Sequence, residues 1–202
     1  MLVVGDDPQA VEADLVGGRL ACPGCGGTLG RYGWARWRQV RTFDGEQSLR
    51  PRRGWCKRCG AAHVLLPAWS APRRRDGTEV IVAALVAKAA GSGHRTIAAV
   101  LGRPASTVRG WLRRAASRAE ATRVAATVWV RALDGGTPAG VSSTPLGDAL
   151  DALGSALAAA RRRLGPPGSA GVLALSAALV APDGSGIVVP VECRYSLRAP
   201  DR

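Results

Sequence analysis

Two cysteine pairs constrain the fold of this 202-residue chain more than any other feature. Cys22 and Cys25 lie in CPGCGG, Cys56 and Cys59 lie in CKRCGA, and thirty residues separate the pairs. A two-residue gap lets one turn direct both sulfurs at the same ion, and four thiolates form the closed tetrahedral shell of a structural zinc. The repeated motif favours zinc over free or disulfide-bonded cysteines and over redox chemistry at a single pair. We therefore expect the four cysteines to bind one structural Zn²⁺.

Two further residues, His63 and Cys193, have side chains that bind metals or react as thiols. His63 follows Cys59 by four residues, and the sequence leaves open whether its ring touches the metal or lies beside a ligand. Cys193 is far from both pairs, and we interpret it as a buried or free thiol.

Residues 19–67 are expected to form a zinc ribbon. Apolar and polar residues alternate on both sides of Asp44-Gly45, which is a hairpin turn signal. Trp34, Trp37 and Trp55 alternate with arginines in this segment. Two interpretations of these tryptophans stay open, namely the aromatic core of a small zinc module or a surface that stacks on nucleic-acid bases.

The charge of the chain is concentrated in its middle. The formal net charge is +13, and residues 19–75 hold thirteen basic residues against Asp44 and Glu46. This distribution indicates a nucleic-acid partner. Residues 1–18 hold four acids and no base, and we expect an acidic, poorly ordered leader there. Residues 68–77 contain a proline and three consecutive arginines, and we expect them to be a basic linker.

Residues 78–118 are expected to form three helices that make a helix-turn-helix domain. In GHRTIAAVLGRPASTVRGWLRR, Gly102 suits the turn because glycine adopts positive φ at little cost, and Pro104 suits a helix start. The last helix has an apolar face and a basic face, as expected when one side packs on its neighbours and the other enters the major groove. The alternative is an ordinary helical hairpin with a solvated basic face.

The expected DNA contacts lie on this last helix and the turn before it. The residues are Arg103, Ser106, Thr107, Arg109, Gly110, Arg113 and Arg114. Arginine makes bidentate contacts to guanine, and we expect Arg103 and Arg114 to bind phosphates. Gly110 lets the helix approach the DNA closely. Auxiliary nucleic-acid contacts are expected from Arg36, Arg38, Arg41, Arg52, Arg53, Arg73, Arg74, Arg75 and His94.

Residues 119–202 are expected to be a helical C-terminal extension with a flexible tail. Leucines at spacings of three and four make 146–164 amphipathic, so this helix forms a homodimer or packs on its own domain. No signal peptide is visible, and no apolar run reaches the roughly 18 residues of a membrane span. We expect a cytoplasmic, nucleoid-associated protein without a membrane or small-molecule partner.

The motifs CPGCGG, CKRCGAAHVLLP and GHRTIAAVLGRPASTVRGWLRR also carry a resemblance. The chain resembles bacterial zinc-ribbon plus helix-turn-helix proteins associated with mobile elements, and the N-terminal DNA-binding part of zinc-ribbon insertion-sequence transposases. The resemblance implies DNA binding, with the four cysteines as ligands and 104–114 as the recognition helix. Such transposases continue into an RNase H-like domain with three metal-binding carboxylates. The seven acids of 119–202 lie instead in Ala- and Gly-rich segments, so we expect no enzyme activity.

The sequence therefore predicts an α+β protein that binds duplex DNA in a sequence-specific way, as a transcriptional regulator or a mobile-element accessory factor. One alternative is a shortened transposase or a transposase subunit. A second alternative is a zinc ribbon that binds RNA or docks on a protein. The DNA target, and the choice between activation and repression, stay open.

Overall fold

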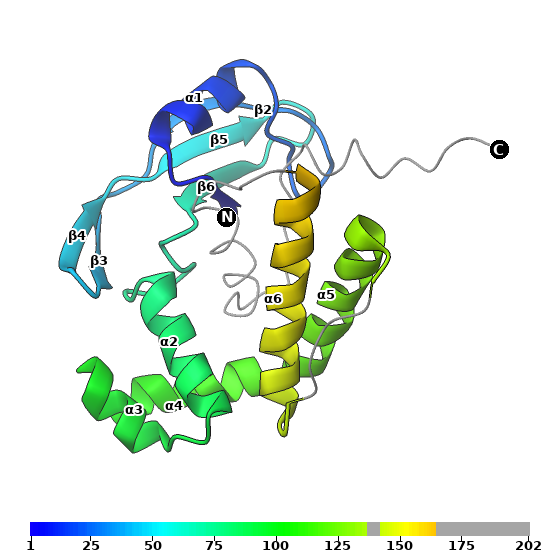
Figure 1. The fold of residues 1–202 in the computed structure, drawn as a ribbon. Coiled ribbons are helices and arrows are strands. Elements are labelled where there is room, and N and C mark those ends of the chain that lie inside the picture. Colours follow the sequence, from blue (N-terminus) through cyan, green and yellow to red (C-terminus); the bar gives the residue numbers. More distant parts are fainter. Residues whose placement is uncertain (137–141, 165–202) are drawn as a thin grey trace.

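The computed structural model describes residues 1–136 and 142–164, which form a β unit followed by a helical unit (Figure 1). The strands are β1 (Leu2–Val4), β2 (Leu29–Trp34), β3 (Arg38–Thr42), β4 (Gly45–Leu49), β5 (Arg52–Cys56) and β6 (Ala62–Pro67). The helices are α1 (Pro8–Val16), α2 (Thr78–Ala89), α3 (His94–Leu101), α4 (Ala105–Ala116), α5 (Ala119–Asp134) and α6 (Pro145–Leu164). The expected α+β class is confirmed. The expected flexible tail and Cys193 lie outside the described residues.

Four strands form the main sheet of the β unit, in the order β1-β6-β5-β2, and β3 and β4 form a separate hairpin. β1 runs parallel to β6, whereas β5 is antiparallel to both β6 and β2. The hairpin expected at Asp44-Gly45 is confirmed, with Thr42 paired to Gly45. Gly45 has a φ of 111°, a conformation in which a side chain would be strained.

The expectation of a poorly ordered leader at residues 1–18 is wrong. The chain begins with β1, which adds a parallel strand to the sheet, and continues into α1. Asp7 accepts a backbone hydrogen bond at the start of α1, as an N-cap residue does. Val11 and Leu15 are buried in the ribbon core. These two apolar residues lie four positions apart and pack one face of α1 on the sheet, although acids surround them in the sequence.

Residues 68–77 carry the expected arginines but do not form a free linker. The Arg41 amide donates to the Arg75 carbonyl at 2.6 Å, and the Gly77 amide donates to the Arg41 carbonyl at 2.8 Å. This segment therefore extends the hairpin with backbone hydrogen bonds. Asp76 is buried here, with 3 % of its surface exposed. We call residues 68–77 the joint, because they lie between the ribbon and the helices.

The three helices expected in residues 78–118 are confirmed as α2, α3 and α4. Their shared core contains Val80, Ile81, Ala84 and Leu85 from α2, Ile97 and Ala98 from α3, and Val108, Trp111, Leu112 and Ala115 from α4. Burial of each large apolar side chain contributes about 1.5–3 kcal/mol before conformational entropy is counted. α3 ends at Gly102, whose φ of 59° is the left-handed conformation that closes a helix.

α5 and α6 lie side by side and extend the same core (Figure 1). Ala126 and Val130 of α5 belong to one cluster with Leu146 and Leu153 of α6. The apolar face of 146–164 is thus used within the chain, which confirms the expectation of packing on its own domain. The other expectation, a homodimer through this face, stays a prediction. Among the described helices, none has the length and apolar character that crossing a membrane requires.

Candidate metal centre and nucleic-acid interface

Two turns with the same hydrogen-bond pattern hold the four cysteines. In the first turn the Gly26 amide donates to the Cys22 carbonyl at 2.8 Å, and in the second the Gly60 amide donates to the Cys56 carbonyl at 2.9 Å. Both glycines have positive φ, at 71° and 73°. The first turn precedes β2 and the second joins β5 to β6, and the pairing of Leu29 with Cys56 sets the two turns side by side.

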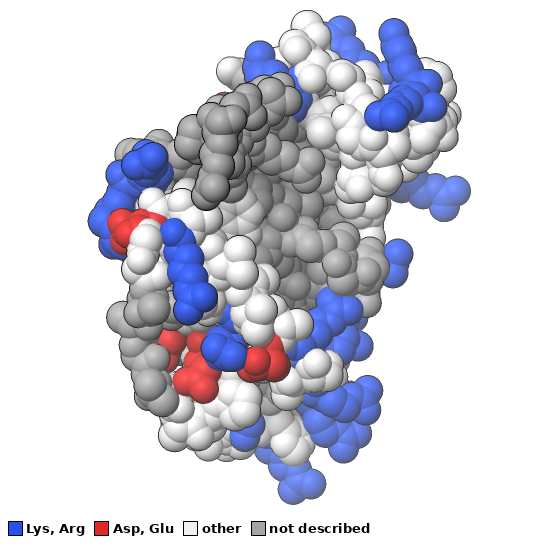
Figure 2. All heavy atoms as spheres, turned by 90° about the vertical axis from the view of Figure 1, so that its right-hand side faces the viewer, with Lys and Arg blue, Asp and Glu red and all other residues white. Residues whose placement is uncertain are grey.

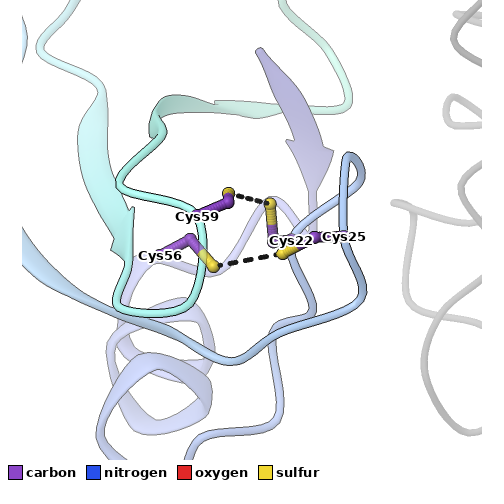
Figure 3. A group of neighbouring side chains, drawn as sticks. All are labelled: Cys22, Cys25, Cys56 and Cys59. Atoms are coloured by element: carbon purple, nitrogen blue, oxygen red, sulfur yellow. Dashed lines mark hydrogen bonds between the residues drawn. The ribbon is translucent and has the colours of Figure 1, made fainter.

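The sulfurs of Cys22, Cys25, Cys56 and Cys59 lie within 4.8 Å of one another (Figure 3). Across the turns, the Cys22 and Cys59 sulfurs are 3.7 Å apart, and the Cys25 and Cys56 sulfurs are 3.5 Å apart. A tetrahedral ion with sulfur at about 2.3 Å places neighbouring sulfurs about 3.8 Å apart. A disulfide would require about 2.05 Å. The arrangement therefore fits one tetrahedral metal ion, and the sequence correctly brought these four residues together.

Gly27 allows the two turns to approach each other. Its amide donates to the Cys25 sulfur at 3.4 Å. A Cβ atom at this position would lie 2.8 Å from Cβ of Arg58 and 3.1 Å from the Cys56 sulfur. The first distance is shorter than carbon atoms tolerate, so a larger residue would push the turns apart.

In the absence of a metal, the pKa values of Cys25 and Cys56 are shifted in opposite directions. Hydrogen bonds led by the Cys59 amide lower the pKa of Cys56 to about 7. The Gly27 amide also lowers the pKa of Cys25, but desolvation and the neighbouring thiols outweigh it and raise that pKa to about 12. Sulfurs this close repel one another when several are ionised. A cation that replaces the protons removes this repulsion, which is why metal binding and thiol ionisation are coupled.

His63 lies next to the sulfur shell and outside it. Its Nε2 atom is 3.4 Å from the Cys22 sulfur, and the group of four candidate ligands does not include it. Burial lowers the pKa of His63 from its ordinary value. The sequence left open whether the His63 ring touches the metal or lies beside a ligand. In the structure the ring contacts the sulfur of Cys22, a candidate ligand.

α4 has two faces of opposite character. Its outward face carries Ser106, Arg109 and Arg113, which are exposed and spaced three and four residues apart. Within the described residues, the side chains of Arg109 and Arg113 form no hydrogen bond or ion pair. α3 and α4 contain no acid. This face therefore presents positive charge that the described part of the chain does not neutralise.

Thr107, Gly110 and Arg114 lie at the border of this outward face and are partly exposed. A Cβ atom at Gly110 would be 3.4 Å from an Arg114 Nη atom, so the Arg114 side chain lies over the glycine. Burial and the charge of Arg114 lower the pKa of Arg74. Arg74 in the joint is thus a neighbour of α4, and the basic surface continues from the helix to the joint.

Arg103 does not have the free guanidinium that a phosphate contact requires. Its Nε atom donates to Asp76 at 2.7 Å, and its Nη1 atom donates to the carbonyls of Leu101 and Gly102. Its side chain is 15 % exposed. We expected Arg103 to bind a phosphate, and this expectation is corrected. The Arg103 guanidinium instead donates to these acceptors and so stabilises the turn between α3 and α4.

Three of the auxiliary arginines also form internal contacts. Arg38 donates to the Arg74 carbonyl, and burial lowers the pKa of Arg38. Arg41 donates to Asp76 at 2.9 Å. Arg52 donates to Glu12 of α1 through Nε at 2.7 Å. These contacts hold the hairpin to the joint and α1 to the sheet. The three arginines, which we expected to contact nucleic acid, therefore have structural partners within the protein.

The other auxiliary residues are more accessible. Arg36, Arg73 and Arg75 are exposed, and within the described residues their side chains have no ion-pair partner. The guanidinium of Arg53 lies over the Tyr32 ring, 4.7 Å from its centroid. His94 is the first residue of α3 and is partly exposed.

Sequence reasoning missed the two acids that organise these arginines. Asp76 joins Arg41 to Arg103, and Glu12 joins Arg31 to Arg52. Asp76 precedes the first residue of α2 by two positions, where an acid is ordinary, so nothing in the local pattern distinguishes it. Glu12 lies between Val11 and Leu15, and that apolar pair was the available signal for a docked helix.

The remaining basic side chains are unevenly distributed over the surface. In Figure 2 basic side chains line the right-hand side of the view from the top of the molecule to the bottom, where no acidic side chain is in view, and others lie on the left and in the lower centre beside the acidic ones. A partner that binds along that right-hand side meets positive charge from both units.

One of the comparisons with known proteins gave a match. Residues 22–111 match the model of DUF6431, a domain of unknown function. The matched range begins at the first candidate ligand and ends within α4, so it spans both cysteine pairs, the joint and the turn before α4. No curated protein and no solved structure matches the chain significantly.

Proposed function

We propose that this protein binds duplex DNA in a sequence-specific way, through a helix-turn-helix formed by α3, the turn after it and α4. A ribbon held by one structural Zn²⁺ supports this domain. The protein acts as a transcriptional regulator or as an accessory protein of a mobile element.

The proposal is supported by the connection between α3 and α4. Gly102 closes α3 in a left-handed conformation, and α4 begins three residues later at Ala105. In a helix-turn-helix the second helix enters the major groove with its N-terminal residues toward the base edges. Ser106 and Arg109 occupy the first two turns of α4 and are exposed.

The chemistry of the outward face of α4 fits DNA. Arg109 and Arg113 can each make a bidentate contact to guanine, and Ser106 and Thr107 can donate to a phosphate or a base. Arg114 lies at the edge of this face, where it reaches a phosphate. The exposed Arg36, Arg73 and Arg75 extend the positive surface along flanking DNA.

The metal is proposed to be zinc because four thiolates with near-tetrahedral spacing form its preferred structural site. All four positions are filled by protein, so no position remains for a reacting water. Metal analysis of the purified protein is expected to find one zinc for each chain. Cobalt(II) in its place is expected to give the absorption spectrum of a tetrahedral thiolate site.

The observation that carries the proposal is the exposed basic face of α4, which has no ion-pair partner in residues 1–136 and 142–164 and lies opposite the buried apolar face of the helix. Selection of bound fragments from a random DNA pool is expected to recover a defined sequence. Arg109→Ala should then cost about 1–3 kcal/mol of binding free energy and relax specificity at one base pair. Arg131→Ala is the matched control, because Arg131 is an exposed arginine at the end of α5. Equal weakening by both variants on all sequences would contradict base recognition.

Two assays separate this proposal from its alternatives. Cleavage of DNA strands by the chain alone with magnesium would indicate a shortened transposase. Competition between the selected duplex and structured RNA tests the RNA-binding alternative. Phosphate neutralisation makes the affinity for either nucleic acid fall steeply with salt, so the competition and not the salt dependence decides.

A further inference from the structure

Four aromatic side chains of the ribbon are exposed, namely Phe43 and three that each lie under an arginine. Tyr32 is 49 % exposed, Trp34 is 53 % exposed and Trp37 is 66 % exposed. The apolar cluster of the ribbon instead contains Leu2, Val11, Leu15, Leu29, Leu65 and the buried cysteines. Of the two interpretations of the tryptophans, the core interpretation therefore does not apply to Trp34 or Trp37. Aromatic side chains on a basic surface are typical of sites that bind single-stranded nucleic acid.

An arginine lies over the rings of Tyr32, Trp34 and Trp37. The guanidinium carbon is 4.7 Å from the ring centroid for Arg53 on Tyr32, 4.9 Å for Arg52 on Trp34 and 5.9 Å for Arg50 on Trp37. Cation–π contacts of this type align the planar guanidinium with the ring. The Tyr32 ring also stacks on Trp55, with centroids 6.5 Å apart and an angle of 27° between the planes.

The rings are reached from the free edge of the sheet. β2 is the last strand in the order β1-β6-β5-β2, so one of its edges has no neighbouring strand among the described residues. Arg52 and Arg53 are consecutive in β5 and point to opposite faces. Tyr32 and Trp34, which they cover, consequently lie on opposite faces of β2. The register shift between Arg31 and Trp34 produces this change.

The ligand that matches this surface has flat rings and negative charge. Bases stack on aromatic side chains and on guanidinium planes, and each stacked base contributes to affinity whatever its identity. Between the two cysteine pairs the only acids are Asp44 and Glu46, which lie in the hairpin turn and β4. The exposed Arg36 and Arg50 supply charge for phosphates beside Trp37.

We propose that the β2 edge, with Tyr32, Trp34 and Trp37 under their arginines, is a second nucleic-acid site that binds unpaired bases of single-stranded DNA. The choice of DNA as the source of these bases rests on the proposed function, because α4 would hold duplex DNA on the same molecule. Such a protein engages a duplex next to an unpaired or opened segment.

The test measures binding of labelled oligothymidylate of roughly a dozen nucleotides to the zinc-loaded full chain by fluorescence anisotropy. Tyr32→Ala and Trp37→Ala are each expected to weaken binding roughly tenfold, and Trp37→Phe is expected to retain most of it. Phe43→Ala is the matched control, because Phe43 is 59 % exposed and no arginine is recorded over its ring within the described residues. Its affinity should equal that of the original protein.

The outcomes separate this site from the one on α4. Trp37→Ala should leave binding of the selected duplex unchanged, and Arg109→Ala should weaken the duplex and leave oligothymidylate unchanged. Failure of the proposed function would show as duplex binding without sequence preference while the oligothymidylate results stand. Equal losses for Phe43→Ala and Trp37→Ala would overturn the second site. Binding of oligouridylate in preference to oligothymidylate would overturn DNA as its ligand, and equal competition by polyphosphate would overturn base stacking.

Discussion

Among single residues, Asp76 connects the ribbon to the helices. Its side chain is 4 % exposed and accepts from Arg41 of β3 at 2.9 Å and from Arg103 before α4 at 2.7 Å. A carboxylate buried between two guanidiniums is stabilised by both, and its removal leaves two cations without a counter-ion. The position of the α3–α4 turn against the hairpin thus depends on one acid.

Asp76→Ala is expected to lower the free energy of unfolding by about 3 kcal/mol, because it leaves the mostly buried Arg103 and the partly buried Arg41 without a counter-ion. Urea denaturation of the metal-loaded protein measures this loss. Asp151→Ala is the control, since Asp151 is exposed on α6 and its removal should change stability by no more than about 0.5 kcal/mol. A loss no larger than that of the control would show that Asp76 does not stabilise the joint.

Gly27 provides a residue-scale test of the metal centre. Gly27→Ala places a methyl group 2.8 Å from Cβ of Arg58 and 3.1 Å from the Cys56 sulfur, so the two turns must separate. We expect metal affinity to fall about 10- to 100-fold, as for other changes beside metal ligands. Titration against a chromophoric chelator measures the affinity. Gly24→Ala is the control, because its nearest neighbour would be the Cys22 sulfur at 3.9 Å, and a similar fall there would argue against the steric explanation.

Among the elements, α1 is held to the sheet by an acid as well as by apolar contacts. Glu12 accepts from Arg52 at 2.7 Å and from Arg31 at 2.6 Å. The hydrogen bond from Arg52 is the main reason that the pKa of Glu12 is lowered from its ordinary value of 4.5. A lowered pKa means that the fold favours the ionised carboxylate. The stabilisation is therefore complete above pH 4.5 and is lost as the pH falls through the folded-state value.

Glu12→Gln is expected to lower stability by about 1 kcal/mol at pH 7, a small value because the pair is partly solvated. The difference from the original protein should stay constant down to about pH 5 and narrow below the ordinary pKa of 4.5. Thermal unfolding of both proteins at each pH measures this difference, and metal release at low pH affects both alike. A difference that does not depend on pH would show that the charge of Glu12 is not involved.

The sequence predicted some elements correctly and missed others. Spacing and turn signals were sufficient for the cysteine pairs, the β3–β4 hairpin and α2 to α4, because local chemistry determines these features. α1 was missed because the four acids of residues 1–18 suggested a solvated segment, although Asp7-Pro8 is an N-terminal helix signal. The partners of Arg103 and Arg52 were not predictable, since they depend on acids 27 and 40 residues away that only the tertiary fold brings close.

For the whole molecule, the two apolar clusters recorded in the described residues have no member in common. One contains Cys22 and Cys56 and packs β1, α1 and the sheet, and the other runs from the joint through α2 to α6. The hydrogen bonds of the joint and Asp76 connect them. Because the four candidate ligands all lie in the ribbon and Cys22 and Cys56 belong to its cluster, we expect a bound metal ion to stabilise the ribbon directly and the helices only through the joint.

Removal of the metal is therefore expected to unfold the ribbon and leave the helices largely intact. After treatment with a chelator and a thiol reductant, amides of β2, β5 and β6 should lose hydrogen-exchange protection, and α1 should follow because it packs on them. Amides of α2, α5 and α6 should keep most of theirs, and far-ultraviolet circular dichroism should retain the helical signal. Added zinc should restore the ribbon, whereas added magnesium should not, because thiolates bind magnesium poorly. Loss of protection in α5 and α6 together with β5 would contradict this division, because it would show that the ribbon and the helices unfold as one cooperative unit.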